Sequence, residues 1–102
     1  MSIEATIREM GSSARIALAK PELTERITRE ILKVEKAKYK RHGKLSPECR
    51  NVAIGHAIDS FDKFFEQIEN KAAVIAFVKR QLSNTRKPVA KKAERFIRKH
   101  AK

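Results

Sequence analysis

The side chains best suited to binding chemistry are concentrated in the last stretch of the chain, from Lys79 to Lys102. Ten lysines and arginines stand there beside one acid, Glu94, so this stretch supplies nine of the twelve net positive charges. Such a density of charge indicates either an anionic partner or a face turned to solvent. A row of cations can neutralise phosphates and release condensed counterions without contacting bases. The predicted phosphate-binding residues are Lys79, Arg80, Arg86, Lys87, Lys91, Lys92, Arg95, Arg98 and Lys99.

A second basic cluster surrounds the only tyrosine of the chain. An aromatic ring among cations can stack on a base or ribose while the lysines hold phosphates. The alternative is a frayed helix end with the tyrosine folded onto the rim of the core. We include this cluster in the predicted nucleic-acid surface. Its members are Lys36, Lys38, Tyr39, Lys40, Arg41 and Lys44.

The remaining reactive residue types form no catalytic or metal-binding signature. The single cysteine, Cys49, excludes an internal disulfide, and no histidine is placed as its base. The three histidines, His42, His56 and His100, do not have the spacing of zinc ligands. Gly11-Ser12-Ser13 lacks the preceding strand and the lysine of a phosphate-binding loop. We therefore expect no enzymatic activity, no cofactor and no bound metal.

Helices are the elements that must position these side chains. Only three glycines and three prolines occur in 102 residues, and each proline stands where a helical pattern begins. Hydrophobic residues make up 41% of the chain and charged residues 35%, which is typical of a folded protein. We predict an all-α fold, a compact bundle of about five helices that forms a single domain over residues 1–102. The expected helices are 3–19, 21–41, 47–69, 71–82 and 88–100.

The hydrophobic periodicity predicts a role for each of the first four helices. The first contains Gly11 and is expected to be continuous or kinked there. The second is expected to run past the edge of the core and to project its basic end, up to Arg41, into solvent. The fourth contains the apolar run from Ala72 to Val78 and is expected to be the centre of the core. The third carries an apolar stripe and a separate acidic stripe that can face a basic neighbour: Asp59, Asp62, Glu66 and Glu69.

The predicted fifth helix places the cations of the basic stretch on one face. Pro88 opens it, and Val89, Ala93, Phe96 and Ile97 are expected to face the core. The cations then share roughly a third of the circumference on the other side, at about 100° per residue. This pattern predicts a docked amphipathic helix instead of a disordered polycation. A helix-turn-helix formed with the preceding helix is an alternative arrangement.

The leading hypothesis for function is a small helical protein that binds DNA or RNA through phosphate contacts of the fifth helix. The alternative is an adaptor or self-associating subunit whose basic face meets an acidic protein, including the acidic stripe of another copy. A membrane role is disfavoured because Phe96 and Ile97 belong to the expected core, and no apolar run approaches the roughly 20 residues of a spanning helix. The N-terminal residues lack an apolar signal segment, so we expect a cytoplasmic protein.

Overall fold

The computed structural model describes residues 3–36, 40–41, 44–45 and 47–101, and these residues form five α-helices, as the periodicity predicted. The α-helices are α1 (Ile3–Ala19), α2 (Thr24–Leu32), α3 (Pro47–Phe64), α4 (Lys71–Arg80) and α5 (Lys87–His100). Short 3-10 turns extend or precede them: η1 (Pro21–Leu23), η2 (Lys33–Lys36), η3 (Phe65–Gln67) and η4 (Gln81–Ser83). Two short strands pair antiparallel: β1 (Lys40–Arg41) and β2 (Lys44–Leu45).

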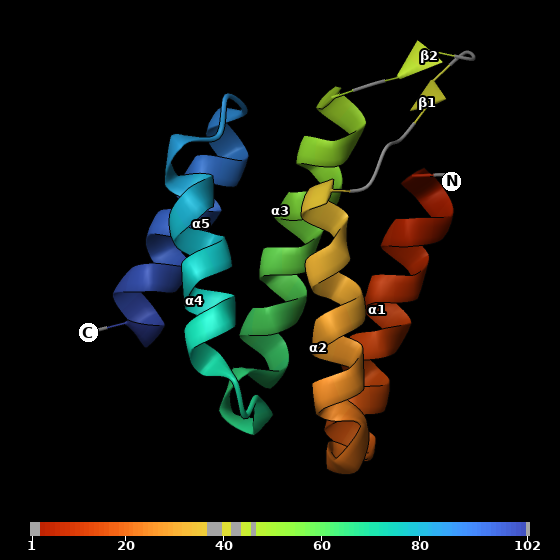
Figure 1. Cartoon of the computed structure of the whole chain (residues 1–102), viewed down its shortest axis with the longest axis vertical. Coiled ribbons are helices and arrows are strands. Elements are labelled where there is room, and N and C mark those ends of the chain that lie inside the picture. The colour runs from red at the N-terminus through yellow and green to blue at the C-terminus, as the bar shows by residue number, and fades with distance from the viewer. Residues whose placement is uncertain (1–2, 37–39, 42–43, 46, 102) are drawn as a thin grey trace.

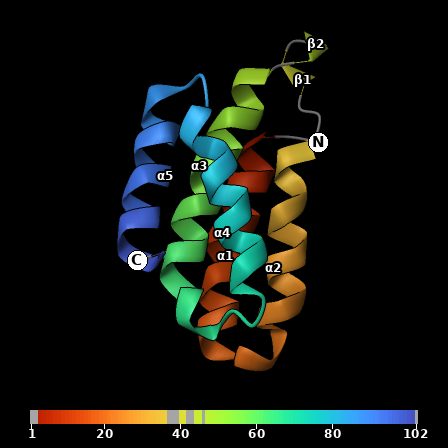
Figure 2. The same cartoon turned by 60° about the vertical axis from the view of Figure 1, so that its left-hand side comes forward.

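Successive helices run antiparallel, so the chain passes up and down the length of the bundle (Figures 1 and 2). α3 lies in the middle, with α1 and α2 on one side and α4 and α5 on the other (Figure 1). The all-α bundle is therefore confirmed. One end of the bundle carries the β1–β2 hairpin and the α4–α5 turn, and the other carries the α1–α2 and α3–α4 turns.

The core is centred on α3, and the prediction that the fourth helix is its centre was wrong. Phe61 of α3 packs edge to face against Phe64 and Phe77, with ring centroids 6.0 and 5.9 Å apart. α4 buries Val74, Phe77 and Val78 on one side only, and its Ala72 and Ala76 are exposed. Alanine loses little when it faces water, because its side chain offers only one methyl group to bury. An apolar run rich in alanine therefore did not require burial on every side.

The second helix is shorter than the predicted span 21–41. Its last regular residue is Leu32, and η2 ends at Lys36. Val34 is the last residue of its apolar stripe and is buried. Beyond it the sequence offers cations and no further apolar stripe, and most helical stability in proteins comes from packing an apolar face. Lys40, Arg41 and Lys44 consequently lie in the β1–β2 hairpin instead of on a projecting helix.

The end of α3 shows how packing overrides local pattern. α3 ends at Phe64, short of the predicted residue 69, because η3 turns the chain so that Phe65 and Ile68 are both buried. Asn70 then caps α4 by accepting a hydrogen bond from the Ala73 amide at 3.1 Å. α1 runs unbroken through Gly11, as expected.

A single glutamine connects the α3–α4 turn to the α1–α2 turn. Gln67 of η3 donates through Nε2 to the Ala17 carbonyl at 2.6 Å and to the Thr24 hydroxyl at 3.1 Å. The carbonyl belongs to the last turn of α1, where backbone acceptors have no intrahelical partner. The contact therefore joins η3, which follows α3, to the α1–α2 pair.

Candidate nucleic-acid interface

α5 is held on the bundle by one buried face. Val89, Ala93 and Phe96 are 2%, 0% and 3% exposed. Gly55 of α3 permits this close approach, since a Cβ atom there would lie 3.3 Å from Cγ2 of Val89. Pro88 stands in the first turn, where its missing amide hydrogen leaves no helical bond unmade. The other side of α5 is therefore presented to solvent in a defined orientation.

The solvent side of α5 carries four exposed cations, which we name the outer stripe: Lys87, Lys91, Arg95 and Arg98. Their spacing of four, four and three residues places them on one face of the helix. The row spans about 16 Å at 1.5 Å of rise per residue. Arg98 pairs with Glu94 on the same helix at 2.7 Å. Lys87, Lys91 and Arg95 have no acidic partner among the residues that the structure describes.

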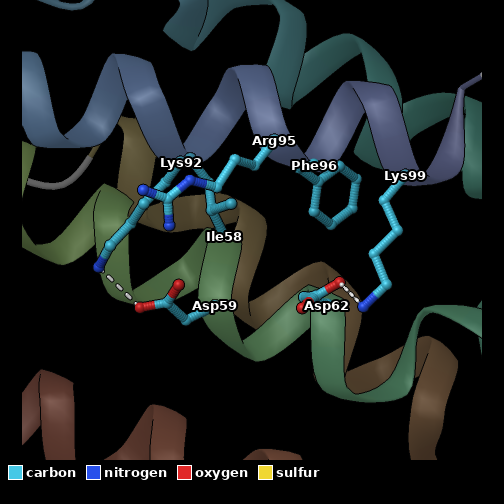
Figure 3. A pocket seen from close by; sticks show the side chains of 7 residues that line it. All are labelled: Ile58, Asp59, Asp62, Lys92, Arg95, Phe96 and Lys99. Atoms are coloured by element: carbon cyan, nitrogen blue, oxygen red, sulfur yellow. Dashed lines mark hydrogen bonds and ion pairs between the residues drawn. The ribbon is translucent and has the colours of Figure 1, made fainter.

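Two further lysines of α5 turn away from the outer stripe and toward α3. Lys92 Nζ lies 2.7 Å from Asp59 Oδ2, and Lys99 Nζ lies 3.1 Å from Asp62 Oδ1 (Figure 3). The prediction that the acidic stripe of α3 faces a basic neighbour is thereby confirmed for its first two members. Between the helices lies a cleft of about 290 Å³, which we name the α3–α5 cleft. Its lining is Ile58, Asp59, Asp62, Lys92, Arg95, Phe96 and Lys99.

The end of α5 is anchored by His100, whose role the sequence analysis missed. Its side chain is only 7% exposed and stacks on Phe65 with ring centroids 4.1 Å apart. Nε2 of His100 lies 2.7 Å from Asp62 Oδ1. Burial works against the charge on Asp62, but hydrogen bonds from His100 and Lys99 outweigh it and lower the pKa of this carboxyl. The available signal was the apolar spacing of α5, which continues from Phe96 to position 100.

Two of the predicted phosphate-binding arginines bridge separate elements of the fold. Arg80 of α4 binds the Glu35 carboxylate through Nε at 3.0 Å and Nη2 at 2.8 Å. This hydrogen-bonded pairing, reinforced by the positive charge and by Gln81, lowers the pKa of Glu35 although burial opposes it. Arg86 likewise pairs with Glu48 of α3. Both arginines are therefore held in place by carboxylates of other elements.

The described members of the second predicted cluster lie at the end of the bundle that also carries the α4–α5 turn (Figures 1 and 2). Lys36 is exposed at the end of η2, and the hairpin carries Lys40, Arg41 and Lys44. Lys38 and Tyr39 lie outside the described residues. The fold thus places the backbone of Lys36, Lys40, Arg41 and Lys44 at the same end as Lys87, the first residue of α5.

The helix-turn-helix alternative does not match the arrangement of α4 and α5. The two helices run antiparallel and side by side (Figures 1 and 2). In a DNA-binding helix-turn-helix the helices cross at about 90–120° and are joined by a turn of three or four residues. The α4–α5 pair is an antiparallel helical hairpin, which presents the long side of α5 and not its first turn.

The other reactive residues that the structure describes do not assemble into a second site. Within the described part of the chain, no three histidine, cysteine or acidic side chains are grouped so as to hold a metal ion. His56 is half-buried on α3, and desolvation together with the nearby Lys92 lowers its pKa. Cys49 is buried in the core. None of the described helices is long and apolar enough to cross a membrane.

Comparison of the chain with protein-family models, curated proteins and solved structures returned no match. Function is therefore inferred from the geometry of α5 and its neighbours. The arrangement offers an anchored helix on which Lys87, Lys91 and Arg95 have no carboxylate partner among the described residues. Lysines bound to carboxylates flank this row on one side. Chemically, such a surface can bind a row of anionic groups.

Proposed function

We propose that the protein binds nucleic acid through the phosphate backbone, with the outer stripe of α5 as the interface. The observation that supports this most directly is the row of Lys87, Lys91 and Arg95, which have no carboxylate partner among the described residues. Adjacent members are about 6 Å apart along the helix axis. Each can therefore meet its own phosphate group instead of sharing one.

The packing of α5 favours a binding role over a merely solubilising one. Its opposite face is buried through Val89, Ala93 and Phe96, so the backbone of the stripe is ordered before any partner arrives. Preorganisation reduces the entropy lost on association. Arg95 and Arg98 add planar guanidinium groups, which bind phosphate through two parallel hydrogen bonds.

Contacts of this kind favour binding that does not depend on base sequence. The long side of α5 offers lysines and arginines that neutralise phosphates, and phosphate contacts carry no sequence information by themselves. Four such contacts on duplex DNA give a slope of log affinity against log salt of roughly −3.6. A steep salt dependence with little preference among sequences is the expected signature.

The proposal is tested by neutralising the outer stripe. The variant K87Q/K91Q/R95Q/R98Q removes four cations from α5, and R8Q/R15Q/R26Q/R29Q removes four exposed cations from α1 and α2. Both variants have the same net charge, so a difference between them reports the location of binding. Fluorescence anisotropy with labelled duplex and single-stranded DNA and RNA, at about 50 and 200 mM salt, measures affinity and slope together.

We expect the outer-stripe variant to bind duplex DNA at least about a hundredfold more weakly at 0.1 M salt and to lose most of its salt dependence. The control variant should keep a slope close to that of the wild type. Equal losses in the two variants would mean that net charge alone drives binding. Absence of salt-dependent binding by the wild type would remove the proposal.

An acidic protein partner is the second candidate, because the same stripe can meet carboxylates. The self-associating form of this idea has less support, since Asp59 and Asp62 are already paired with lysines of their own α5. Only Glu66 and Glu69 of the acidic stripe are exposed without a side-chain ion pair in the described part of the chain. Light scattering at two salt concentrations tests this form, and a strict monomer excludes it.

A further inference from the structure

We propose that Asp59 and Asp62 restrain nucleic-acid binding by holding Lys92 and Lys99 against α3. This inference rests on the proposed function, because it concerns how many cations of α5 a phosphate backbone can reach. In the wild type, two carboxylates occupy two of the lysines next to the outer stripe. An interface with six cations is thereby reduced to one with four. Arg98 is counted among the four because its pair with Glu94, at 76% and 56% exposure, is open to water on both sides.

The two restrained lysines, Lys92 and Lys99, lie directly beside the outer stripe. Arg95 belongs to the outer stripe and also lines the α3–α5 cleft. Lys92 precedes it by one helical turn and Lys99 follows it by one turn, so the three project from the same side of α5 (Figure 3). A phosphate that contacts Arg95 is consequently within one turn of both lysines. The two lysines would extend the outer stripe into a band if no carboxylate held them.

The two ion pairs are weak enough that each lysine can exchange its carboxylate for a phosphate group. The side chains of Lys92 and Asp59 are 35% and 48% exposed, and those of Lys99 and Asp62 are 63% and 41% exposed. Ion pairs this accessible to water contribute little net stability. The lysines are therefore not locked in place, but each approaching phosphate meets a carboxylate that competes for the same ammonium group and repels the phosphate.

Neutral isosteres remove the restraint while leaving the packing in place. Asparagine keeps the shape of aspartate, and its carbonyl oxygen can still accept a hydrogen bond from His100. The buried face formed by Val89, Ala93 and Phe96 is untouched, so α5 remains docked. The D59N/D62N variant should therefore fold as the wild type does while releasing both lysines.

The chain supplies a matched control just beyond the end of α3, with Glu66 in η3 and Glu69 after it. Glu66 and Glu69 are exposed, and α5 forms no ion pair with either of them in the described part of the chain. E66Q/E69Q raises the net charge by two, as D59N/D62N does, without releasing a lysine of α5. Any difference in affinity between these two variants therefore measures the specific competition.

The experiment compares the wild type, D59N/D62N and E66Q/E69Q on a labelled duplex DNA over a salt series. Each additional phosphate contact steepens the slope by about 0.9 and strengthens binding by roughly tenfold near 0.1 M salt. We expect D59N/D62N to bind at least about tenfold more tightly than E66Q/E69Q, with a slope near −5.4 instead of −3.6. Adding K92Q/K99Q to D59N/D62N should abolish the gain.

The outcomes separate this inference from the proposed function. If the wild type binds duplex DNA and the two acid variants behave alike, the restraint by Asp59 and Asp62 is refuted and the proposed function stands. A gain that survives K92Q/K99Q also refutes it. If the wild type shows no salt-dependent binding, the proposed function fails first. Should D59N/D62N fold poorly, K92Q/K99Q alone decides: it should reduce the slope far less than K87Q/K91Q, and an equal reduction overturns the inference.

Discussion

Replacement of Gly11 by alanine should stabilise the protein, because α1 is continuous through this residue. A Cβ atom built at Gly11 meets no atom within 4 Å, so alanine fits without any shift. Glycine in a helix interior costs about 0.5–1 kcal/mol relative to alanine, chiefly through the larger entropy of the unfolded chain. G11A should therefore raise the free energy of unfolding by about 0.5–1 kcal/mol.

The second helical glycine provides the comparison. At Gly55 the same Cβ atom would lie 3.3 Å from Cγ2 of Val89 and 3.7 Å from Nζ of Lys92. Val89 is buried in the contact between α3 and α5 and has little room to move away. Overpacking costs about 1–3 kcal/mol, which cancels or exceeds the gain in helix propensity. G55A should be neutral or destabilising by up to about 2 kcal/mol.

Urea unfolding followed by far-ultraviolet circular dichroism measures both variants. A gain of 1 kcal/mol corresponds to a rise of about 4 °C in Tm for a domain of this size. The dependence on denaturant should have the same slope in all three proteins, so that midpoints report stability directly. If G11A is no more stable than the wild type at equal slope, α1 is not a continuous helix at Gly11 and the reasoning fails.

Three further predictions concern the core, a helix cap and an ion pair. F61A should destabilise the protein by about 3–5 kcal/mol, because it empties the centre of the ring cluster; near-native stability would contradict this assignment of the core. N70A should cost about 1 kcal/mol in urea unfolding through loss of the hydrogen bond to Ala73, whereas N70S should cost much less. The lowered pKa of Glu35 means that its pairing with Arg80 is fully stabilising above the ordinary pKa of 4.5 and is lost as pH falls through the lower folded value. E35Q should therefore flatten the loss of stability with acid in this range, and an unchanged pH profile would show that the pair does not contribute.

Most of the helical architecture could be predicted from residue spacing alone. The fifth helix begins within one residue of its predicted start, and the fourth ends in a 3-10 turn at its predicted end. Such patterns are local, because an apolar residue every three or four positions defines a face whatever that face packs against. The prediction for the second helix was wrong beyond Val34, where the apolar stripe ends. The local pattern did not indicate that the chain would form a hairpin there.

The candidate site, like the fold, could be predicted from the sequence only in part. The sequence alone placed the cations on one amphipathic helix and predicted that an acidic stripe would face a basic neighbour. It could not show that Lys92 and Lys99 are the lysines that meet that stripe, or that Arg80 is bound by Glu35.

The sequence by itself determined the number and approximate positions of the helices, the net charge of +12 and the amphipathic character of the basic end. Only the tertiary structure decided which cations of the described residues are paired with carboxylates. The reason is physical: helical faces follow from contacts three or four residues apart, whereas the pairing of Lys92 with Asp59 spans 33 residues and depends on how two helices are rotated and shifted against each other.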